Sequence, residues 1–272
     1  IFLKDYSSDN WVMEVQETEK RGYKRVVYRA IDVSKFASDY LFKMGKKVLL
    51  MSATILNAEG FANSLGISKD EYSAISIPSP FPVENRPILN VSVGSMSAKM
   101  INDTLPRIKN AVQAIMDEHP DQKGIIHCHT YKIANYLKYN LKSRKYANRI
   151  LIHDSQNRDA VLQKHMKSKS PTVLLSPSMT EGVDLKGDLS RFQIICKVPY
   201  PYLGDPIIRK RMNKNKKWYP MKTAMSIVQS CGRSVRTAND TAVTYILDSD
   251  WYSFYSRNKD VFPAGFKESI VK

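Results

Sequence analysis

Cysteine is scarce in this sequence of 272 residues, which holds only Cys128, Cys196 and Cys231, with no CxxC pair. Thiols this widely spaced supply neither the disulfide frame of a small secreted domain nor the four ligands of an iron–sulfur cluster. We therefore expect reduced thiols in an intracellular protein and no iron–sulfur cluster in this chain.

Long apolar runs and a phosphate-binding loop are also missing. No run approaches the roughly 20 apolar residues that span a bilayer, and no signal-peptide pattern opens the chain, so we expect no membrane partner. Because the first residue is Ile1 rather than Met, we expect a fragment of a longer polypeptide. The pattern G-x-x-x-x-G-K-[ST] is absent, so the chain lacks the loop that usually holds ATP phosphates.

Acidic residues are few relative to basic ones. The 26 Asp and Glu residues face 42 Lys and Arg residues, which gives a net charge of +16. Such an excess suits a polyanion such as nucleic acid, because each phosphate contact releases condensed counterions. A solvated basic surface is the alternative explanation of the charge alone.

Short apolar runs alternate with amphipathic stretches along the chain. The runs predict buried strands at 47–51, 88–93, 124–128, 149–152, 172–175, 192–197 and 242–247. Apolar residues of helical period predict helices near 33–44, 104–118, 131–143, 158–167 and 221–235. This alternation predicts an α/β fold with a mainly parallel sheet, whose ligands bind at the carboxyl ends of the strands.

The predicted organisation is one domain with a lead-in. Residues 1–45 form the lead-in segment with a packing helix, and residues 46–272 form the domain. An insert at about 200–220, rich in aromatic, proline and basic residues, interrupts the alternation. Basic and aromatic side chains together could neutralise phosphates and stack on bases of a nucleic acid. The alternative is that the insert is a solvent-exposed surface loop without a binding role.

The strongest local signal is the segment 229–236, QSCGRSVR, on the predicted helix before the last strand. Residues spaced by four and three share a helix face, so Gln229, Arg233 and Arg236 are expected on one side. Guanidinium groups make forked, permanently charged contacts with phosphate oxygens. The alternative is that both arginines are solvent-exposed residues of a basic protein and bind no phosphate.

Three further loops follow predicted strands. Residues 173–185 lead into a polar loop in which Glu181 and Asp184 can accept hydrogen bonds and Gly182 permits a tight turn, although an ordinary turn would look the same. Ser52 and Thr54 follow the first run. After the run at 124–128, Thr130 is expected to cap a helix whose free N–H groups favour a phosphate.

Metal sites are disfavoured by the sequence. His127 and His129 lie on the same side of their predicted strand, but no third ligand is near them in sequence, so we expect no metal site. The segment 117–119, DEH, resembles the acidic magnesium box of ATPases. It ends an amphipathic helix rather than a strand, which argues against that function.

The order of SAT (52–54), HTY (129–131), TEGVD (180–184) and Q-x-x-G-R-x-x-R (229–236) resembles motifs III to VI of superfamily 2 helicases. The segments 31–36, 79–81 and 198–206 are similar to the XPD/DinG branch of these DNA helicases. The resemblance covers roughly residues 30–263, and it implies a RecA-like three-layer fold, with the sheet between helices, acting as the second of two motor domains.

The resemblance also implies roles for these residues. ATP with Mg²⁺ would lie against a first RecA-like domain, which brings the phosphate loop and most of the magnesium ligands. Arg233 and Arg236 would act as arginine fingers, helped by Gln229. Nucleotide-binding residues would be Glu181, Gly182, Asp184 and Gly232. Ser52 and Thr54 would couple hydrolysis to domain closure.

Single-stranded DNA is the partner that the resemblance implies. Its contacts on this chain would be Thr130, Tyr131, Ser176, Ser178 and Thr180. The alternatives are a nucleic-acid-binding module of a helicase-like protein that no longer hydrolyses ATP, and an unrelated α/β enzyme. The latter is disfavoured because no nucleophile–base pair, metal cluster or dinucleotide-binding glycine loop is present.

Overall fold

A computed structural model describes residues 6–7, 9–18, 22–154, 156–177 and 184–271. The chain divides into two compact units, each described by itself below. Unit 1 comprises residues 1–76 and 200–223, and unit 2 comprises residues 77–199 and 224–272. None of the helices among the described residues is long and apolar enough to cross a membrane.

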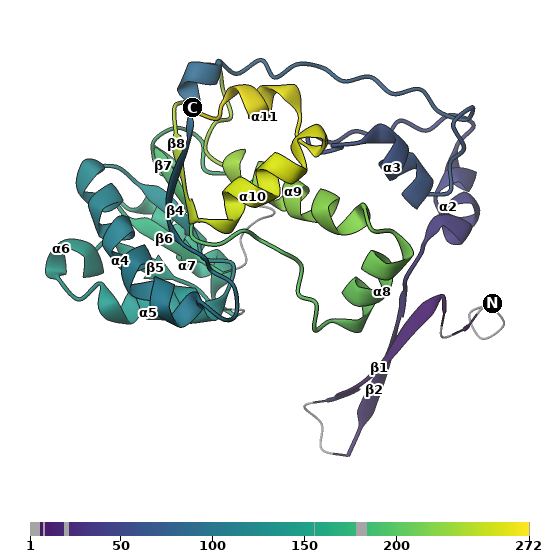
Figure 1. The fold of residues 1–272 in the computed structure, drawn as a ribbon, viewed down its shortest axis with the longest axis horizontal. Coiled ribbons are helices and arrows are strands. Elements are labelled where there is room, and N and C mark those ends of the chain that lie inside the picture. The colour runs from purple at the N-terminus through teal and green to yellow at the C-terminus, as the bar shows by residue number, and fades with distance from the viewer. Residues whose placement is uncertain (1–5, 8, 19–21, 155, 178–183, 272) are drawn as a thin grey trace. The chain divides into compact units, whose positions relative to one another are not determined.

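Unit 2 is built on a six-stranded parallel sheet with the strand order β3-β8-β7-β4-β6-β5 (Figure 1). The strands are β3 (Ile88–Gly94), β4 (Gly124–His127), β5 (Ile150–Ile152), β6 (Val173–Ser176), β7 (Phe192–Ile195) and β8 (Val243–Asp248). Parallel strands need crossover connections, and the intervening chain supplies the helices that cover the sheet. The predicted α/β, RecA-like fold is confirmed.

Two helix layers cover this sheet. The helices are α4 (Ile101–Glu118), α5 (Tyr131–Asn140), α6 (Arg144–Ala147), α7 (Arg158–Lys167), α10 (Asp250–Arg257) and α11 (Ala264–Glu268). Ile126 and Ile194 pack with α4 and α5 in the main core. Ile125 faces the opposite side, in a smaller cluster with α7 residues. Because side chains alternate along a strand, the central strands β4, β6 and β7 are buried on both faces.

Short 3₁₀ turns complete unit 2 at Val83–Asn85, Gly187–Leu189 and Lys259–Val261. At the start of β4, Gly124 lies opposite Phe192 of β7. A Cβ atom at Gly124 would overlap the Phe192 ring, so this position has no room for any larger residue.

Unit 1 contains an antiparallel hairpin of β1 (Trp11–Glu17) and β2 (Lys24–Ala30). Its helices are α2 (Ser34–Tyr40), the 3₁₀ turn Phe42–Met44, α3 (Ala58–Ser64) and α8 (Pro206–Lys214), and α9 (Trp218–Cys231) begins here and continues into the residues of unit 2. Asp205 caps α8 by accepting the Ile207 N–H, and its carboxylate also pairs with Arg29 of the hairpin.

One predicted strand is wrong. Residues 47–51 form no strand, and the side chains of Leu49 and Met51 are 80% and 81% exposed. A strand requires a neighbour for its backbone N–H and C=O groups, and no described residue pairs with this run. The run is as apolar as a buried strand, but neither sheet of the described residues includes it.

Candidate functional site

The strands of unit 2 all run in one direction, so the residues after them gather at one side of the sheet. We call this side the carboxyl edge; its described members are residues 95–97, 128–130, 153–154, 177, 196–199 and 249. Ligands of parallel α/β sheets bind at this side, because loops from several strands converge there.

Asp248, the last residue of β8, ties the loops of the carboxyl edge together. Its buried carboxylate accepts the backbone N–H of Met96 at 3.0 Å and that of Val198 at 2.9 Å. Burial raises the pKa of Asp248, and these hydrogen bonds oppose the rise. Lys197 lies nearby and donates to the Met96 carbonyl oxygen. The loops after β3 and β7 are therefore fixed to the end of β8.

The segment that carries both candidate arginines, residues 232–240, is a loop, which we call the arginine loop. The Asp240 carboxylate accepts the backbone N–H of Arg236 and of Thr237, each at 3.0 Å. Burial alone would raise the pKa of Asp240, but these hydrogen bonds outweigh it and lower the pKa. The Leu185 N–H donates to the Arg233 carbonyl oxygen at 3.2 Å. Leu185 thus holds the Arg233 end of the loop, and Asp240 closes a turn in its second half.

The two arginines have different neighbours. Arg236 Nε lies 3.3 Å from Asp184 Oδ1, and both side chains remain partly exposed. The charge of Arg233 acts on His127, the last residue of β4. Burial lowers the pKa of His127 to about 4, and the positive charge of Arg233 contributes to that shift. Arg233 therefore lies near the carboxyl end of β4.

The connection from β4 to α5 adds polar groups at the carboxyl edge. His129 has a positive φ of 61°, a left-handed backbone conformation that few non-glycine residues adopt. Thr130 caps α5, as its Oγ1 atom accepts the Ile133 N–H at 3.3 Å, which confirms the predicted cap. Tyr131 follows with 45% of its side chain exposed.

A small pocket opens between these elements. Its lining comes from the ends of β4, β6 and β7 and from α9: His127, His129, Ser176, Pro177, Ile195, Lys197, Pro199 and Ser230. His127 is only 4% exposed, and neither ring nitrogen has a hydrogen-bond partner among the described residues. The neutral imidazole of His127 thus shares the lining with Lys197 and lies within the field of Arg233.

Comparison with known proteins identifies the family. The sequence pattern described as "Helicase C-terminal domain" matches residues 112–267, more than half of the chain. The chain belongs to the helicase C-terminal domain family. The matched range of this helicase domain includes β4 to β8 and the whole arginine loop.

Relatives of this helicase domain are distant but consistent. The "ATP-dependent DNA helicase DinG" of Photobacterium profundum is 25% identical over 80% of the chain, which covers 34% of that protein. The "Probable ATP-dependent helicase MJ0942" of Methanocaldococcus jannaschii is 24% identical over 93% of the chain, which covers 44% of that protein. The chain therefore spans less than half the length of these relatives.

Solved structures show the same fold. The structure named "XPD_APO" aligns with a TM-score of 0.65 and 15% identity, over 87% of this helicase domain and 50% of that chain. The structure of S. tokodaii Xpd4 aligns with a TM-score of 0.52 and 16% identity, over 71% of this chain and 40% of that chain. The resemblance to XPD/DinG-type helicases read from the motifs is confirmed.

One geometric prediction for the helicase domain is wrong: Gln229, Arg233 and Arg236 do not share a helix face. α9 ends at Cys231, so Gln229 is helical while both arginines lie in the arginine loop. The Arg233 N–H bonds to the Ser230 carbonyl oxygen in a tightened last turn. Glycine at 232 disfavours helix, and Asp240 takes the N–H of Arg236 that a longer helix would use.

The remaining predicted residues are placed as follows. Ser52 and Thr54 belong to unit 1, where their hydroxyl oxygens lie 3.2 Å apart in a local turn. Ser176 is buried at the end of β6 and lines the small pocket. Asp184 and Gly232 lie beside and within the arginine loop. The predicted residues Ser178, Thr180, Glu181 and Gly182 lie outside the described residues.

The sequence reading missed the residues that position this site. Nothing in the motifs indicated Asp240, which closes a turn by accepting the Arg236 N–H, or Asp248, which accepts the Val198 N–H from a loop distant in sequence. A single signal was available for Asp248, an acidic residue ending an apolar strand. In the part of the chain that the structure describes, no group of three or more His, Cys, Asp or Glu side chains could hold a metal ion.

Proposed function

We propose that this helicase C-terminal domain is the second motor domain of an ATP-dependent DNA helicase. In this proposal, ATP with Mg²⁺ binds between the domain and a first RecA-like domain of the same polypeptide. The observation that carries it is the fixed conformation of the arginine loop, in which the Leu185 N–H donates to the Arg233 carbonyl oxygen and Asp240 accepts the Arg236 N–H. A loop whose backbone is fixed at Arg233 and at Arg236 presents these arginines in a preorganised arrangement.

In the proposed reaction, Arg236 and Arg233 are the arginine fingers. Phosphoryl transfer develops charge on the γ-phosphate oxygens, and a guanidinium placed there stabilises it. Arg236 suits this role because Asp184 orients its Nε side while part of the side chain remains exposed. Gln229, at the end of α9, would orient the nucleotide or the attacking water, and Gly232 would let the nucleotide approach the backbone.

The first RecA-like domain is the proposed partner for nucleotide binding, and most Mg²⁺ ligands are assigned to it. The exposed run 47–51 supports such a partner, since apolar side chains of strand-like composition are normally covered. Ser52 and Thr54 follow this run directly, where they would couple hydrolysis to domain closure. Glu181, Gly182 and Asp184 would connect the nucleotide to the DNA.

Single-stranded DNA is proposed to cross the carboxyl edge near the start of α5. Thr130 and the exposed Tyr131 would contact it there, and the segment from Ser176 to Thr180 would supply further contacts. The net charge of +16 supports a polyanionic partner. Because the hydroxyl of Thr130 accepts the Ile133 N–H, its own proton remains available to donate to a phosphate oxygen.

The decisive experiment compares two arginine substitutions in the full-length protein. Arg236→Ala should lower DNA-stimulated ATP hydrolysis on the order of 10³-fold, because an arginine finger contributes about that much. Binding of single-stranded DNA should change little. Arg257→Ala is the matched control, since Arg257 is an exposed arginine at the end of α10.

Two results would overturn the proposal. Full hydrolysis by the Arg236→Ala protein would remove Arg236 from catalysis. A wild-type full-length protein that binds DNA without any DNA-stimulated hydrolysis would instead support a nucleic-acid-binding module that has lost ATPase activity.

A further inference from the structure

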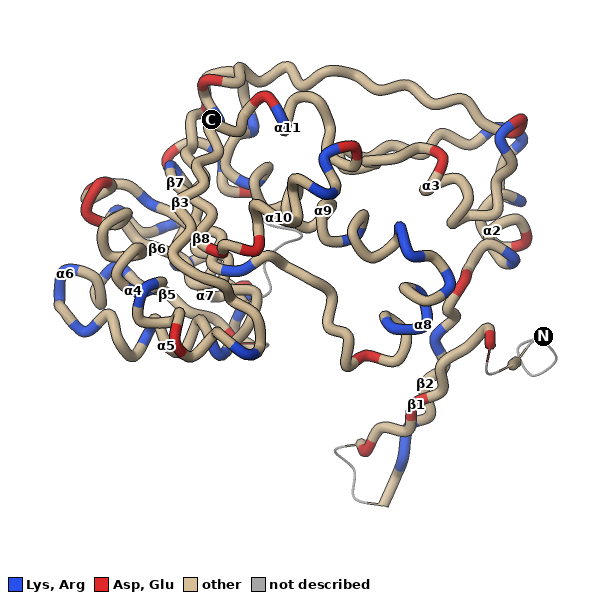
Figure 2. The backbone as a smooth tube through the Cα atoms, in the orientation of Figure 1, with Lys and Arg blue, Asp and Glu red and all other residues tan. Residues whose placement is uncertain are grey.

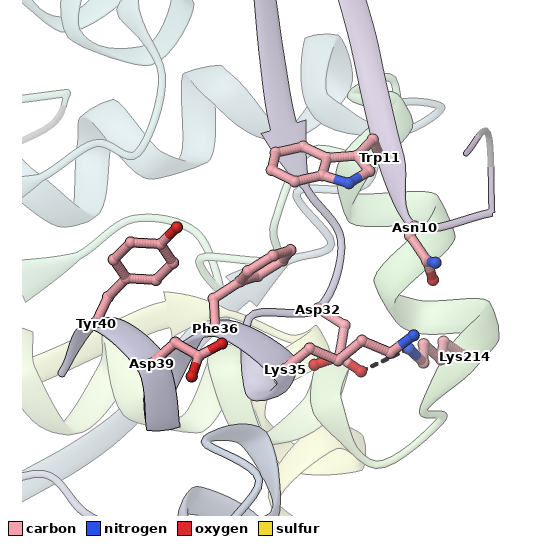
Figure 3. A pocket seen from close by; sticks show the side chains of 8 residues that line it. All are labelled: Asn10, Trp11, Asp32, Lys35, Phe36, Asp39, Tyr40 and Lys214. Carbon is pink, nitrogen blue, oxygen red and sulfur yellow. Dashed lines mark hydrogen bonds and ion pairs between the residues drawn. The ribbon is translucent and has the colours of Figure 1, made fainter. Parts of the chain in front are cut away.

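A cavity of about 220 Å³ lies in unit 1, outside the carboxyl edge (Figure 3). Three aromatic side chains contribute to its wall, Trp11 from β1 and Phe36 and Tyr40 from α2. The rings of Trp11 and Phe36 contact one another, with centroids 5.6 Å apart at an angle of 56°. Tyr40 lies at the rim with 58% of its side chain exposed.

The rest of the lining is polar. It consists of Asn10, Asp32, Lys35, Asp39 and Lys214. Lys214 Nζ lies 2.5 Å from Asp32 Oδ2. Burial tends to raise the pKa of Asp32, but hydrogen bonds from Lys214 and from Ser34 reverse this and bring the pKa to about 2. The cavity therefore has an aromatic wall and a wall of amide, carboxylate and ammonium groups.

Helix α8 is fixed against this cavity by more than the Lys214 pair. Arg211 Nε donates to the Ile31 carbonyl oxygen at 2.9 Å, and its Nη2 donates to the Ala30 carbonyl oxygen at 3.0 Å. Asp205, which caps α8, pairs with Arg29 of β2. The helix and the cavity wall thus form one connected structure rather than two independent surfaces.

The segment that contains α8 is strongly basic. From 206 to 217 it holds six basic residues and no acidic one (Figure 2): Arg209, Lys210, Arg211, Lys214, Lys216 and Lys217. All but Arg211 are exposed. A segment with so many positive and no negative residues attracts a polyanion. Lys214 belongs both to this segment and to the lining of the cavity.

From these contacts we propose that the cavity binds one unstacked base of a single-stranded nucleic acid, whose neighbouring phosphates lie along residues 206–217. The base stacks on the rings of Tyr40 and Phe36, and Asn10 and Asp39 accept hydrogen bonds from its N–H groups. Lys35 and Lys214 reach the adjacent phosphates. The inference rests on the proposed DNA-binding function and adds a binding site in unit 1.

A cationic side chain of another protein segment is the competing occupant, because aromatic rings and carboxylates also bind cations. The charges disfavour it. Within the cavity the carboxylates of Asp32 and Asp39 are balanced by Lys35 and Lys214, and the adjoining segment 206–217 adds only positive charge. This positive charge repels a cationic side chain, whereas it attracts the phosphates that are linked to a base.

The test uses the full-length protein and two oligonucleotides of equal length and charge, an oligothymidine and a fully abasic strand. The wild-type protein should bind the oligothymidine more tightly. Tyr40→Leu removes the ring but keeps apolar bulk, and should weaken oligothymidine binding about fivefold or more, since one stacked base contributes about that much. Binding of the abasic strand and the salt dependence of both affinities should not change.

Two further variants make the result specific. Tyr40→Phe keeps the ring and should restore oligothymidine binding. Tyr252→Leu removes a similarly exposed tyrosine of α10 in unit 2 and should leave both affinities unchanged. Equal affinities of Tyr40→Leu and wild-type protein for oligothymidine would overturn the base site.

Photocrosslinking gives an independent readout. An oligonucleotide with 5-iodouracil should crosslink to an aromatic residue within 10–43, and Tyr40→Leu should reduce that product relative to any crosslink at Tyr131. Crosslinks confined to other regions would overturn the inference, and would fit a cavity filled by a basic side chain. Neither outcome depends on the Arg236→Ala hydrolysis test, so failure of the catalytic proposal and failure of the base site are distinguishable.

Discussion

The carboxylate of Asp240 accepts the backbone N–H of Arg236 at 3.0 Å, and so fixes the conformation of the loop that carries the proposed arginine finger. The same oxygen accepts the Thr237 N–H. Because Asp240 is buried, removal of its carboxylate would leave both N–H groups without that acceptor. A residue that touches no nucleotide is therefore placed to control where Arg236 points.

Asp240→Ala should destabilise the domain by about 1–3 kcal/mol, because the Arg236 and Thr237 N–H groups lose their hydrogen bonds to a carboxylate. It should also lower ATP hydrolysis by the full-length protein, because the position of Arg236 is lost. Urea unfolding and a steady-state ATPase assay measure the two effects. Asp260→Ala, at an exposed position in unit 2, is the control, and equal stability of the two variants would refute the role of Asp240.

The pair of Arg236 and Asp184 should behave differently. Both side chains are partly exposed, so the pair contributes at most about 1 kcal/mol to stability. Asp184→Asn should hardly change the urea midpoint, yet should lower ATP hydrolysis, since the orientation of the guanidinium is no longer fixed. Asp188→Asn, which breaks the exposed pair with Arg191, should leave hydrolysis unchanged. Full activity of Asp184→Asn would show that the pair does not orient Arg236.

Stability should fall as the pH decreases from about 7 towards 4. The pKa of His127 and of His165 is about 4 in the folded protein, lowered first by burial, whereas an unfolded histidine titrates near 6.5. Between these values the unfolded state binds more protons, so acid favours unfolding. The stability contributed by the neutral rings is complete above about pH 6.5 and declines below it.

At pH 5.5 each of these two histidines should lower the free energy of unfolding by on the order of 1 kcal/mol relative to pH 7.5. His127→Leu should flatten the dependence, because it removes one titrating ring that has no hydrogen-bond partner among the described residues. Urea unfolding of wild-type and variant protein at several pH values makes the comparison. Parallel pH profiles for the two proteins would contradict the assignment.

The sequence predicted the sheet of unit 2 well because buried parallel strands are continuous apolar runs. β7 begins at Phe192 and β6 ends at Ser176, each within a few residues of the predicted bounds. The hairpin β1–β2 was not predicted, although each of its strands is a β-rich run and Gly22 between them has a positive φ of 88°. The hairpin lies within the predicted lead-in segment 1–45, in which the only element predicted was the helix near 33–44.

The candidate site was predicted less completely, since sequence spacing alone does not show where a helix ends. Periodicity placed Arg233 and Arg236 on α9, but the helix ends at Cys231 and the Arg236 N–H instead donates to the side chain of Asp240. The motif order identified the arginines, and the structure identified the residues that hold them. Thr130 was predicted correctly because an N-cap depends on local sequence.

Close packing predicts a large difference between two glycine substitutions. Gly124→Ala places a Cβ atom inside the Phe192 ring, which is itself stacked on His119 with centroids 4.6 Å apart. Overpacking of this kind should lower the free energy of unfolding by about 1–3 kcal/mol. Gly232→Ala meets its nearest atom, the Val228 carbonyl oxygen, at 3.4 Å and should leave stability nearly unchanged or slightly raised. Thermal unfolding would measure both, and equal midpoints would contradict the packing argument.

The exposed run 47–51 gives a prediction that separates the isolated chain from the full-length protein. Leu49 and Met51 are 80% and 81% exposed, so the double substitution Leu49→Lys, Met51→Lys should change the stability of the isolated chain by less than about 0.5 kcal/mol. In the full-length protein the same change should lower DNA-stimulated ATP hydrolysis, because two lysines would be buried against the first motor domain. Tyr139→Lys, which charges an exposed side chain of α5, should leave hydrolysis unaffected. Unchanged hydrolysis by the double variant would mean that the run is solvated in the whole protein and that the first domain docks elsewhere.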